Sequence, residues 1–265
     1  MSEGRIYAKI VRRGLTLVVL GMVYNGLFKL DFENLRIASV LGRIGLAWSI
    51  AAVLYLNFGV KTRAAIAVAV LAGYGALSAL VAAPDAAGAG PLTFEGNLAG
   101  YIDRQFLPGK LIYGSFDPEG LLSTVPAVVT AMLGMFTGEF VRRGDIRGGR
   151  KTLWMAAAAA ALLAAGLAFS GVLPVNKKLW SSTFVCVVGA YSLGMFALFY
   201  YLIDVRGWRR WTLFFRVVGL NSITIYLAQR IVGFGRISDF FLGGIASKCP
   251  CLLYTSPSPR DGATS

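Results

Sequence analysis

Long hydrophobic runs alternate with short polar segments along most of the chain. A helix must run for about 20 residues to cross a hydrocarbon core of roughly 30 Å, and in lipid it satisfies its own backbone hydrogen bonds. The pattern predicts seven such helices, near residues 14–30, 37–58, 64–83, 121–141, 152–172, 180–203 and 213–233. We therefore expect an all-α fold, a polytopic bundle of about seven transmembrane helices.

The pattern ends abruptly near the C-terminus, where residues 249–265 are rich in serine and proline. This composition is typical of a disordered tail or a non-native addition, so we expect residues 1–248 to form one transmembrane domain. Within it, Gly134 and Gly138 share a helix face and predict close helix packing. Glu139 and Arg143 are four residues apart and predict an ion pair within one helix.

Composition and charge agree with a membrane protein. Hydrophobic residues make up 56% of the chain, and the mean hydropathy is +0.65. The net charge of +13 would suggest nucleic-acid binding in a soluble protein. Here most basic residues instead gather in alternate loops, namely Arg5, Lys9, Arg12, Arg13, Lys61, Arg63, Arg142, Arg143, Arg147, Arg150, Lys151, Arg206, Arg209 and Arg210. That side should be cytoplasmic, with the N-terminus, so lipid and not nucleic acid is the expected partner.

Two polar turns lie between apolar spans on the opposite side, FDPEGLL at 116–122 and PVNKKLW at 174–180. Asp117 before Pro118 is a favourable helix N-cap, but a carboxylate of Asp117 or Glu119 could equally receive an ammonium or orient a base. Asn176 and Lys177 could simply form a tight polar turn. The functional alternative is that they hold a sugar hydroxyl or a developing oxyanion. Asn221, in the last span, needs a hydrogen-bond partner across helices or binds substrate.

Two arginines near the second span are candidates for anion binding. Arg36 and Arg43 are seven residues apart and share one helix face. A charge at mid-bilayer costs about 2.5–3.5 kcal/mol, so Arg43 should face the bundle interior. A guanidinium suits a phosphate or a carboxylate, and pairing with a buried carboxylate or carbonyl is the structural alternative.

Histidine is absent, and the three cysteines form no disulfide framework. A histidine base or histidine metal site therefore cannot be built from these residues, and we expect no metal.

Four segments carry a resemblance to a known family. They are LRIASVLGRIG (35–45), FDPEGLLSTVPAV (116–128), PVNKKLWSSTFV (174–185) and GLNSITIYLAQRIV (219–232). In this order they resemble the heparan-α-glucosaminide N-acetyltransferase-like family of polytopic membrane acyltransferases, over nearly all of residues 9–233. The resemblance implies transfer of acetyl from cytoplasmic acetyl-CoA to an amino sugar on the extracytoplasmic side, in a bacterial inner membrane.

The resemblance also implies roles for particular residues. Asp117 and Glu119 would support catalysis, while the family's presumed catalytic histidine lies upstream of this chain, which we therefore expect to be the inactive middle part of a longer protein. The remaining roles are substrate binding by Asn176, Lys177 and Asn221 and binding of acetyl-CoA, the co-substrate, by Arg36 and Arg43. A sugar transporter without covalent chemistry is the main alternative, a non-catalytic scaffold is another, and a homo-oligomer is possible.

Overall fold

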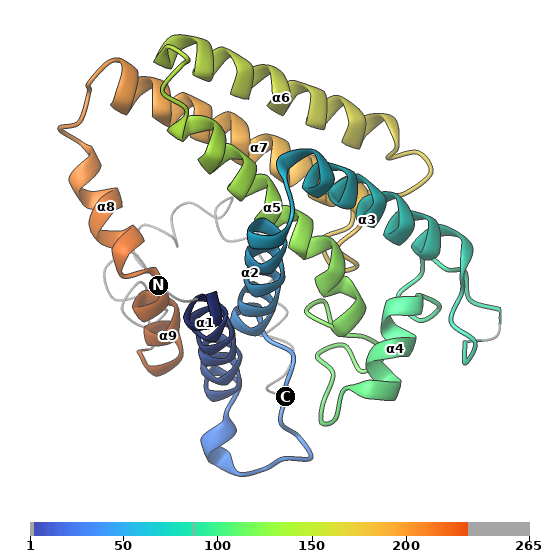
Figure 1. Ribbon diagram of the computed structural model, residues 1–265. Helices are drawn as coiled ribbons and strands as arrows, with labels where there is room; N and C mark the ends of the chain where they lie inside the picture. The colour runs from blue at the N-terminus through green and yellow to red at the C-terminus, as the bar shows by residue number, and fades with distance from the viewer. Residues whose placement is uncertain (1–2, 87, 233–265) are drawn as a thin grey trace, which may run out of the picture. The chain divides into compact units, whose positions relative to one another are not determined.

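The computed structural model describes residues 3–86 and 88–232 (Figure 1). In these residues the regular elements are helical, with two isolated bridge pairs and no strand. The predicted all-α fold is confirmed. The chain divides into two compact units, residues 1–209 and 210–265. The segment 249–265, expected to be a tail, lies outside the described residues.

The first unit is built from long helices joined by short turns and one long loop. Its α-helices are α1 (Glu3–Tyr24), α2 (Val40–Asn57), α3 (Val60–Leu80), α4 (Leu98–Phe106), α5 (Leu121–Arg142), α6 (Gly148–Ala168) and α7 (Ser182–Tyr200). A short 3-10 turn, η1 (Leu27–Lys29), follows α1, and a π-helical turn, η2 (Tyr201–Val205), extends α7. The long loop between α3 and α5 contains α4, which the sequence pattern did not predict.

Among the described residues, five helices are long and apolar enough to cross a membrane: α2, α3, α5, α6 and α7 with η2. They support an integral membrane protein, but the predicted count of seven spans is not confirmed. The first expected span, 14–30, runs past the end of α1 at Tyr24. Although α1 has 22 residues, Lys9, Arg12 and Arg13 lie within it and make it less apolar than the other five.

The second unit contains two short helices where the sequence predicted one span at 213–233. These are α8 (Thr212–Leu220) and α9 (Ser222–Ile231), with 9 and 10 residues. Asn221 separates them, and its side-chain Nδ2 donates to the carbonyl of Val217 in the preceding helix (2.9 Å). The sequence predicted a hydrogen-bond partner for this amide on another helix. The partner is instead a backbone carbonyl four residues earlier in the chain.

Close approach of α1 and α2 depends on small residues. The two helices are antiparallel, since the Tyr7 hydroxyl near the start of α1 donates to Asn57 at the end of α2 (3.0 Å). A Cβ added to Gly45 would lie 2.7 Å from the carbonyl oxygen of Gly14. Glycine therefore permits this contact. The prediction for Gly134 and Gly138 was wrong, because an added Cβ at either would meet no atom within 4 Å.

The helix directions place the loops at two ends of the first unit. Arg43, near the start of α2, contacts Ser123 at the start of α5. Arg63, at the start of α3, instead pairs with Glu139 near the end of α5 (2.8 Å). The loops that carry most of the cations therefore lie at one end, and the FDPEGLL turn lies at the other.

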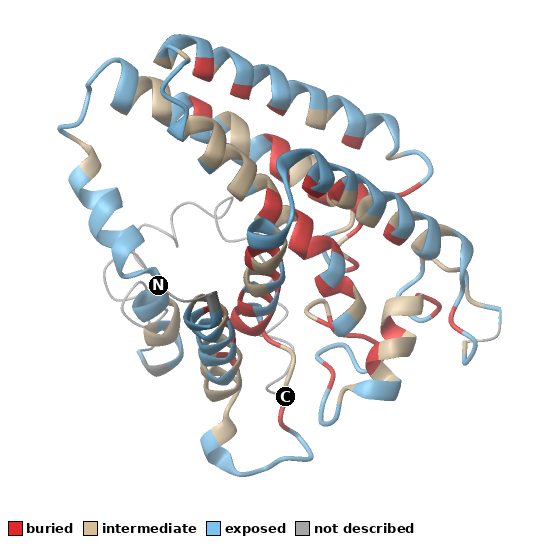
Figure 2. Cartoon of the chain, viewed as in Figure 1, coloured by how far each residue is buried: buried red, intermediate tan, exposed pale blue. Residues whose placement is uncertain are grey.

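The core lies where α2, α5 and α7 face one another, with a contribution from α3 (Figure 2). Its buried residues are Ala47, Ala51, Ala67, Ala127, Val128, Val129, Met132 and Val185. Outward-facing apolar side chains such as Leu153 on α6 and Tyr191 on α7 remain exposed. Such exposure is expected for helices whose outer faces contact lipid.

Candidate functional site

Backbone contacts with a distant loop hold Arg36 before α2. The prediction that Arg36 and Arg43 share one helix face was wrong, because α2 begins only at Val40. Arg36 forms an isolated antiparallel bridge with Gly109, and the Lys110 N–H donates to the carbonyl of Leu35 (3.2 Å). Gly109 has φ +84°, and a Cβ there would overlap the Leu35 carbonyl oxygen. Only glycine permits this approach. The bridge brings the loop before the FDPEGLL turn against the start of α2.

Arg36 binds both carboxylates of that turn. Its Nε donates to Asp117 Oδ2 (2.7 Å) and its Nη2 to Asp117 Oδ1 (2.6 Å), and Nη2 also contacts Glu119 Oε2. The Asp117 side chain is fully buried, while those of Arg36 and Glu119 are 19% and 17% exposed. This bidentate pairing matches the structural alternative considered for the arginines. A role for Arg36 toward acetyl-CoA stays a prediction.

The pair stabilises the charged forms of its members. Burial alone would raise the pKa of Asp117, but the hydrogen bonds and charge of Arg36, with backbone N–H groups of Glu119 and Ile112, hold that pKa below its ordinary value. Burial alone would lower the pKa of Arg36, but the hydrogen bond and charge of Asp117 raise it overall. Both groups are therefore ionised near neutral pH.

Asp103, on α4, supplies the first acceptor for α5. The helix begins at Leu121, so the prediction that Asp117 caps it was wrong. Asp103 accepts instead from the N–H of Leu121 (2.9 Å) and from that of Asp117 (3.3 Å). A Cβ on Gly120 would overlap the Asp103 carboxylate. Burial raises the pKa of Asp103 to about 6, although the backbone N–H groups oppose the shift.

Arg43 is buried and reaches the same turn from inside α2, as expected for a charge in a span. Its Nη2 contacts the Pro118 carbonyl oxygen and Ser123 Oγ, and its guanidinium lies over the Trp180 ring, 4.4 Å from the centroid. Within the described residues, Arg43 Nε and Nη1 and Trp180 Nε1 are buried without a hydrogen-bond partner. A buried donor left unpaired costs about 1–3 kcal/mol, so these groups favour a bound oxygen atom.

The PVNKKLW turn contacts this cluster through its last residue, Trp180, whose ring lies under the Arg43 guanidinium. Asn176 Oδ1 accepts from the Lys178 N–H (2.8 Å), which is the tight turn considered from the sequence. Lys177 is exposed, while the Lys178 ammonium lies 4.5 Å from the Tyr113 ring centroid. The structure thus brings Lys178 against the long loop, whereas the sequence had placed it only in water. Substrate binding by Asn176 and Lys177 stays a prediction.

Four of the predicted residues meet in one cluster: Arg36, Arg43, Asp117 and Glu119. Asn221 lies in the second unit, and its predicted role is untested. Sequence reasoning missed Asp103, Ser123 and Trp180. Ser123 and Trp180 fall inside the resembling segments and could have been found there, whereas Asp103 lies outside them. In the described chain, no group of three or more His, Cys, Asp or Glu residues is placed to hold a metal ion.

Comparisons with known proteins agree with the resemblance. No protein-family model matches the chain. The heparan-alpha-glucosaminide N-acetyltransferase of Homo sapiens is 27% identical over 287 aligned residues, which cover 87% of this chain and 43% of that protein. The protein of the same name from Mus musculus is 30% identical over 155 residues, covering 52% of this chain and 24% of that protein.

The chain therefore spans less than half the length of the curated relatives it matches. The similarity nevertheless extends over most of its own length, including the segments that form the cluster. The chain is thus distantly similar to the heparan-alpha-glucosaminide N-acetyltransferases, and the resemblance identified from its sequence is confirmed.

Proposed function

We propose that this membrane protein takes part in acetyl transfer from acetyl-CoA to the amine of an amino sugar, at the end of the helices where the two polar turns meet. The names of its relatives, N-acetyltransferases that act on a glucosaminide, support the reaction class. One structural observation carries the proposal: a carboxylate with spare acceptor capacity lies beside buried donors that have no acceptor among the described residues.

The chemistry sets two requirements for such a site. The amine nitrogen attacks the thioester carbonyl carbon, a C–N bond forms, the C–S bond breaks, the nitrogen loses a proton and the sulfur gains one. An amino sugar is mostly an ammonium ion at neutral pH, so a group must first accept its proton. A second group must stabilise the negative charge that develops on the carbonyl oxygen.

Glu119 is the group that we assign to the amine. Its side chain is 17% exposed, and only Oε2 contacts Arg36. Among the described residues, none donates a hydrogen bond to Oε1 of Glu119. Asp117 differs, because its carboxylate is fully buried and accepts from Arg36 and from two backbone N–H groups. Asp117 is therefore a positioning residue that fixes Arg36 and, through it, Glu119.

Arg43 and Trp180 are the groups that we assign to the carbonyl oxygen. Arg43 Nη2 is held by Pro118 and Ser123, which leaves Nε and Nη1 with no acceptor in the described chain. Donors that are fixed in advance stabilise a developing oxyanion without reorganisation. The cation–π contact with the Trp180 ring keeps the Arg43 guanidinium in place.

We further propose the orientation in the membrane. The cation-rich loops at the opposite end of the helices favour a cytoplasmic location for that end. The cluster would then face the extracytoplasmic side, where an amino sugar is available, and acetyl-CoA would enter from the cytoplasm. A bacterial inner membrane fits this arrangement.

Because the chain contains no histidine, the first test is ligand binding and not turnover. The purified chain in detergent is titrated with acetyl-CoA and with glucosamine. Glu119→Gln is expected to weaken glucosamine binding only. Trp180→Phe, which keeps a ring beneath Arg43, is expected to weaken acetyl-CoA binding by about 5-fold, the equivalent of one hydrogen bond. Trp154→Phe, at an exposed ring on α6, is the matched control.

A wild-type chain that binds neither acetyl-CoA nor glucosamine would contradict the proposal. The transporter alternative has its own signature. Proteoliposomes that accumulate chemically unchanged glucosamine, with no dependence on acetyl-CoA, would favour a permease over a transferase.

A further inference from the structure

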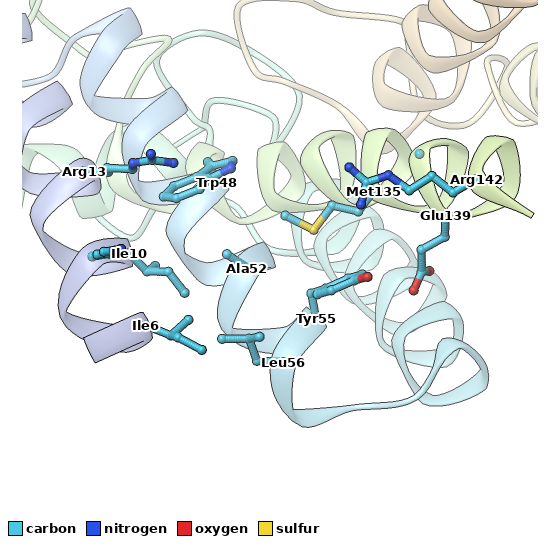
Figure 3. Close-up of a pocket in the computed structure, with 12 residues that line it drawn as sticks. Ile6, Ile10, Arg13, Trp48, Ala52, Tyr55, Leu56, Met135, Glu139 and Arg142 are labelled. Carbon is cyan, nitrogen blue, oxygen red and sulfur yellow. The ribbon is translucent and has the colours of Figure 1, made fainter. Parts of the chain in front are cut away.

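A pocket of about 440 Å³ lies between α1, α2 and α5, at the end of these helices opposite the Asp117 cluster (Figure 3). Its volume falls within the range of small-molecule sites, roughly 300–1,000 Å³. Trp48, Ala52, Tyr55 and Leu56 of α2 line it together with residues of α1 and α5. None of the residues assigned to the acetyl-transfer site lines this pocket.

Cations from two helices line the pocket. Lys9 and Arg13 come from α1, and Arg142 comes from the last turn of α5. Figure 3 shows Arg13 beside Trp48 on one side of the pocket and Arg142 beside Met135 on the other. Neither guanidinium forms a hydrogen bond or ion pair with any residue in 3–86 or 88–232. The two side chains are therefore available to an external anion.

Among the described residues that line the pocket, Glu139 is the one carboxylate, and Arg63 already balances its charge. Both of its oxygens accept from Arg63 Nη2 (2.8 and 3.0 Å). Arg63 is buried, with its guanidinium 4.6 Å from the Tyr55 ring centroid. The predicted pairing of Glu139 with Arg143 was wrong, since Arg143 binds Asp145 (2.8 Å). Glu139 therefore does not compensate Arg13 or Arg142.

The rest of the lining is apolar. Ile6, Ile10, Ala52 and Leu56 contribute aliphatic surface, and Met135 and Trp48 add larger side chains. A ligand that matches this lining carries several negative charges together with an apolar or weakly polar part. Phosphate esters are the biological groups that bidentate guanidinium donors suit best.

Resting on the acetyl-transfer function proposed above, we propose that this pocket binds the phosphate groups of acetyl-CoA, with Arg13 and Arg142 as the main contacts. The phosphates would thus meet these residues and not Arg36, whose guanidinium is bound by carboxylates.

Helix geometry supports a ligand that extends from one site toward the other. Trp48 of the pocket and Arg43 of the cluster lie on α2, five residues apart, which corresponds to about 7.5 Å along the axis. A coenzyme A molecule holds its phosphates at one end and its thioester at the other, joined by a long flexible arm. A phospholipid headgroup with a single phosphate would use the cations less completely.

The test measures coenzyme A binding to the full chain in detergent. Arg13→Gln and Arg142→Gln are each expected to weaken binding roughly 10-fold, the size expected for a charged hydrogen bond. Dephospho-coenzyme A should bind the wild type more weakly than coenzyme A, and the difference should shrink in both variants. Arg147→Gln, at an exposed arginine outside the pocket, should leave binding unchanged, and the thermal midpoint of each variant reports its folding.

Unchanged coenzyme A binding in both folded pocket variants would overturn this inference and leave the proposed function standing. A second measurement compares thermal midpoints in phosphatidylglycerol and phosphatidylcholine nanodiscs. If the variants lose only the extra stability that phosphatidylglycerol gives the wild type, the pocket is a lipid site and this inference is likewise overturned. A wild-type chain that binds no coenzyme A would overturn this inference, and one that binds neither coenzyme A nor glucosamine would overturn the proposed function as well.

Discussion

Arg36 and Asp117, which are 81 residues apart in the chain, form a bidentate ion pair with contacts of 2.7 and 2.6 Å. The pair joins the segment before α2 to the turn before α5. Asp117 is fully buried, so this pair fixes the position of the turn and of Glu119 beside it. Removal of Arg36 would leave Asp117 as an uncompensated buried charge.

Arg36→Met should destabilise the folded chain by roughly 3 kcal/mol, because Asp117 would remain buried without its cation. The double variant Arg36→Met with Asp117→Leu should recover part of this loss, since neither charge remains. Unfolding in mixed detergent micelles measures both free energies. If the double variant is less stable than the sum of the two single variants predicts, the pair is not the source of the effect.

Two glycines, Gly120 just before α5 and Gly134 within it, should respond oppositely to alanine. Gly120→Ala places a Cβ in the Asp103 carboxylate and should destabilise the fold, because the acceptor for the start of α5 must move. Gly134→Ala adds a Cβ in open space within α5 and should stabilise the helix by roughly 0.5–1 kcal/mol. Thermal midpoints of the two variants check this contrast, and equal shifts in one direction would contradict it.

Asp103 should make the stability depend on pH in a defined window. Its pKa is raised from 3.8 to about 6 by burial, so its contribution is fully present below pH 3.8 and is lost as the pH rises through 6. The pKa of Asp117 is lowered, so its contribution is lost only as the pH falls below 3.8. Between about pH 4 and 7, stability should therefore fall by at most about 3 kcal/mol because of Asp103.

Asp103→Asn removes this titration while keeping an acceptor for one backbone N–H. The thermal midpoint of the variant should change less between pH 4 and 7 than that of the wild type, by an amount that matches the Asp103 contribution. A variant with an unchanged pH profile would show that another group titrates in this window.

The membrane class, the all-helical fold and five of the spans follow from hydrophobic runs alone, because lipid imposes that pattern directly. The first and last expected spans could not be settled this way. Charges at Lys9, Arg12 and Arg13 lie inside α1, and Asn221 divides the last segment into α8 and α9. Hydropathy measures transfer into lipid, and it does not determine where a helix ends.

The residues of the candidate site were predictable, but their partners were not. Arg36, Arg43, Asp117 and Glu119 were all identified from charge and segment resemblance. Spacing within one helix indicates which side chains share a face, and it says nothing of contacts such as the one between Arg36 and Asp117. The same limit explains Glu139, where the near neighbour Arg143 was expected and the distant Arg63 is bound.

Arg63 should control the charge of the α1–α2–α5 pocket without lining it. Arg63→Gln would leave Glu139 as a free carboxylate facing the phosphate groups proposed to bind there, and should weaken coenzyme A binding about 2- to 5-fold, as for a partly exposed charge pair. Glu139→Gln in the same chain removes that carboxylate and should restore the affinity. Isothermal titration of wild type, Arg63→Gln and the double variant measures this directly. If the double variant stays as weak as Arg63→Gln, then Arg63 acts through packing against Tyr55 and Phe136, and the electrostatic account of the pocket is wrong.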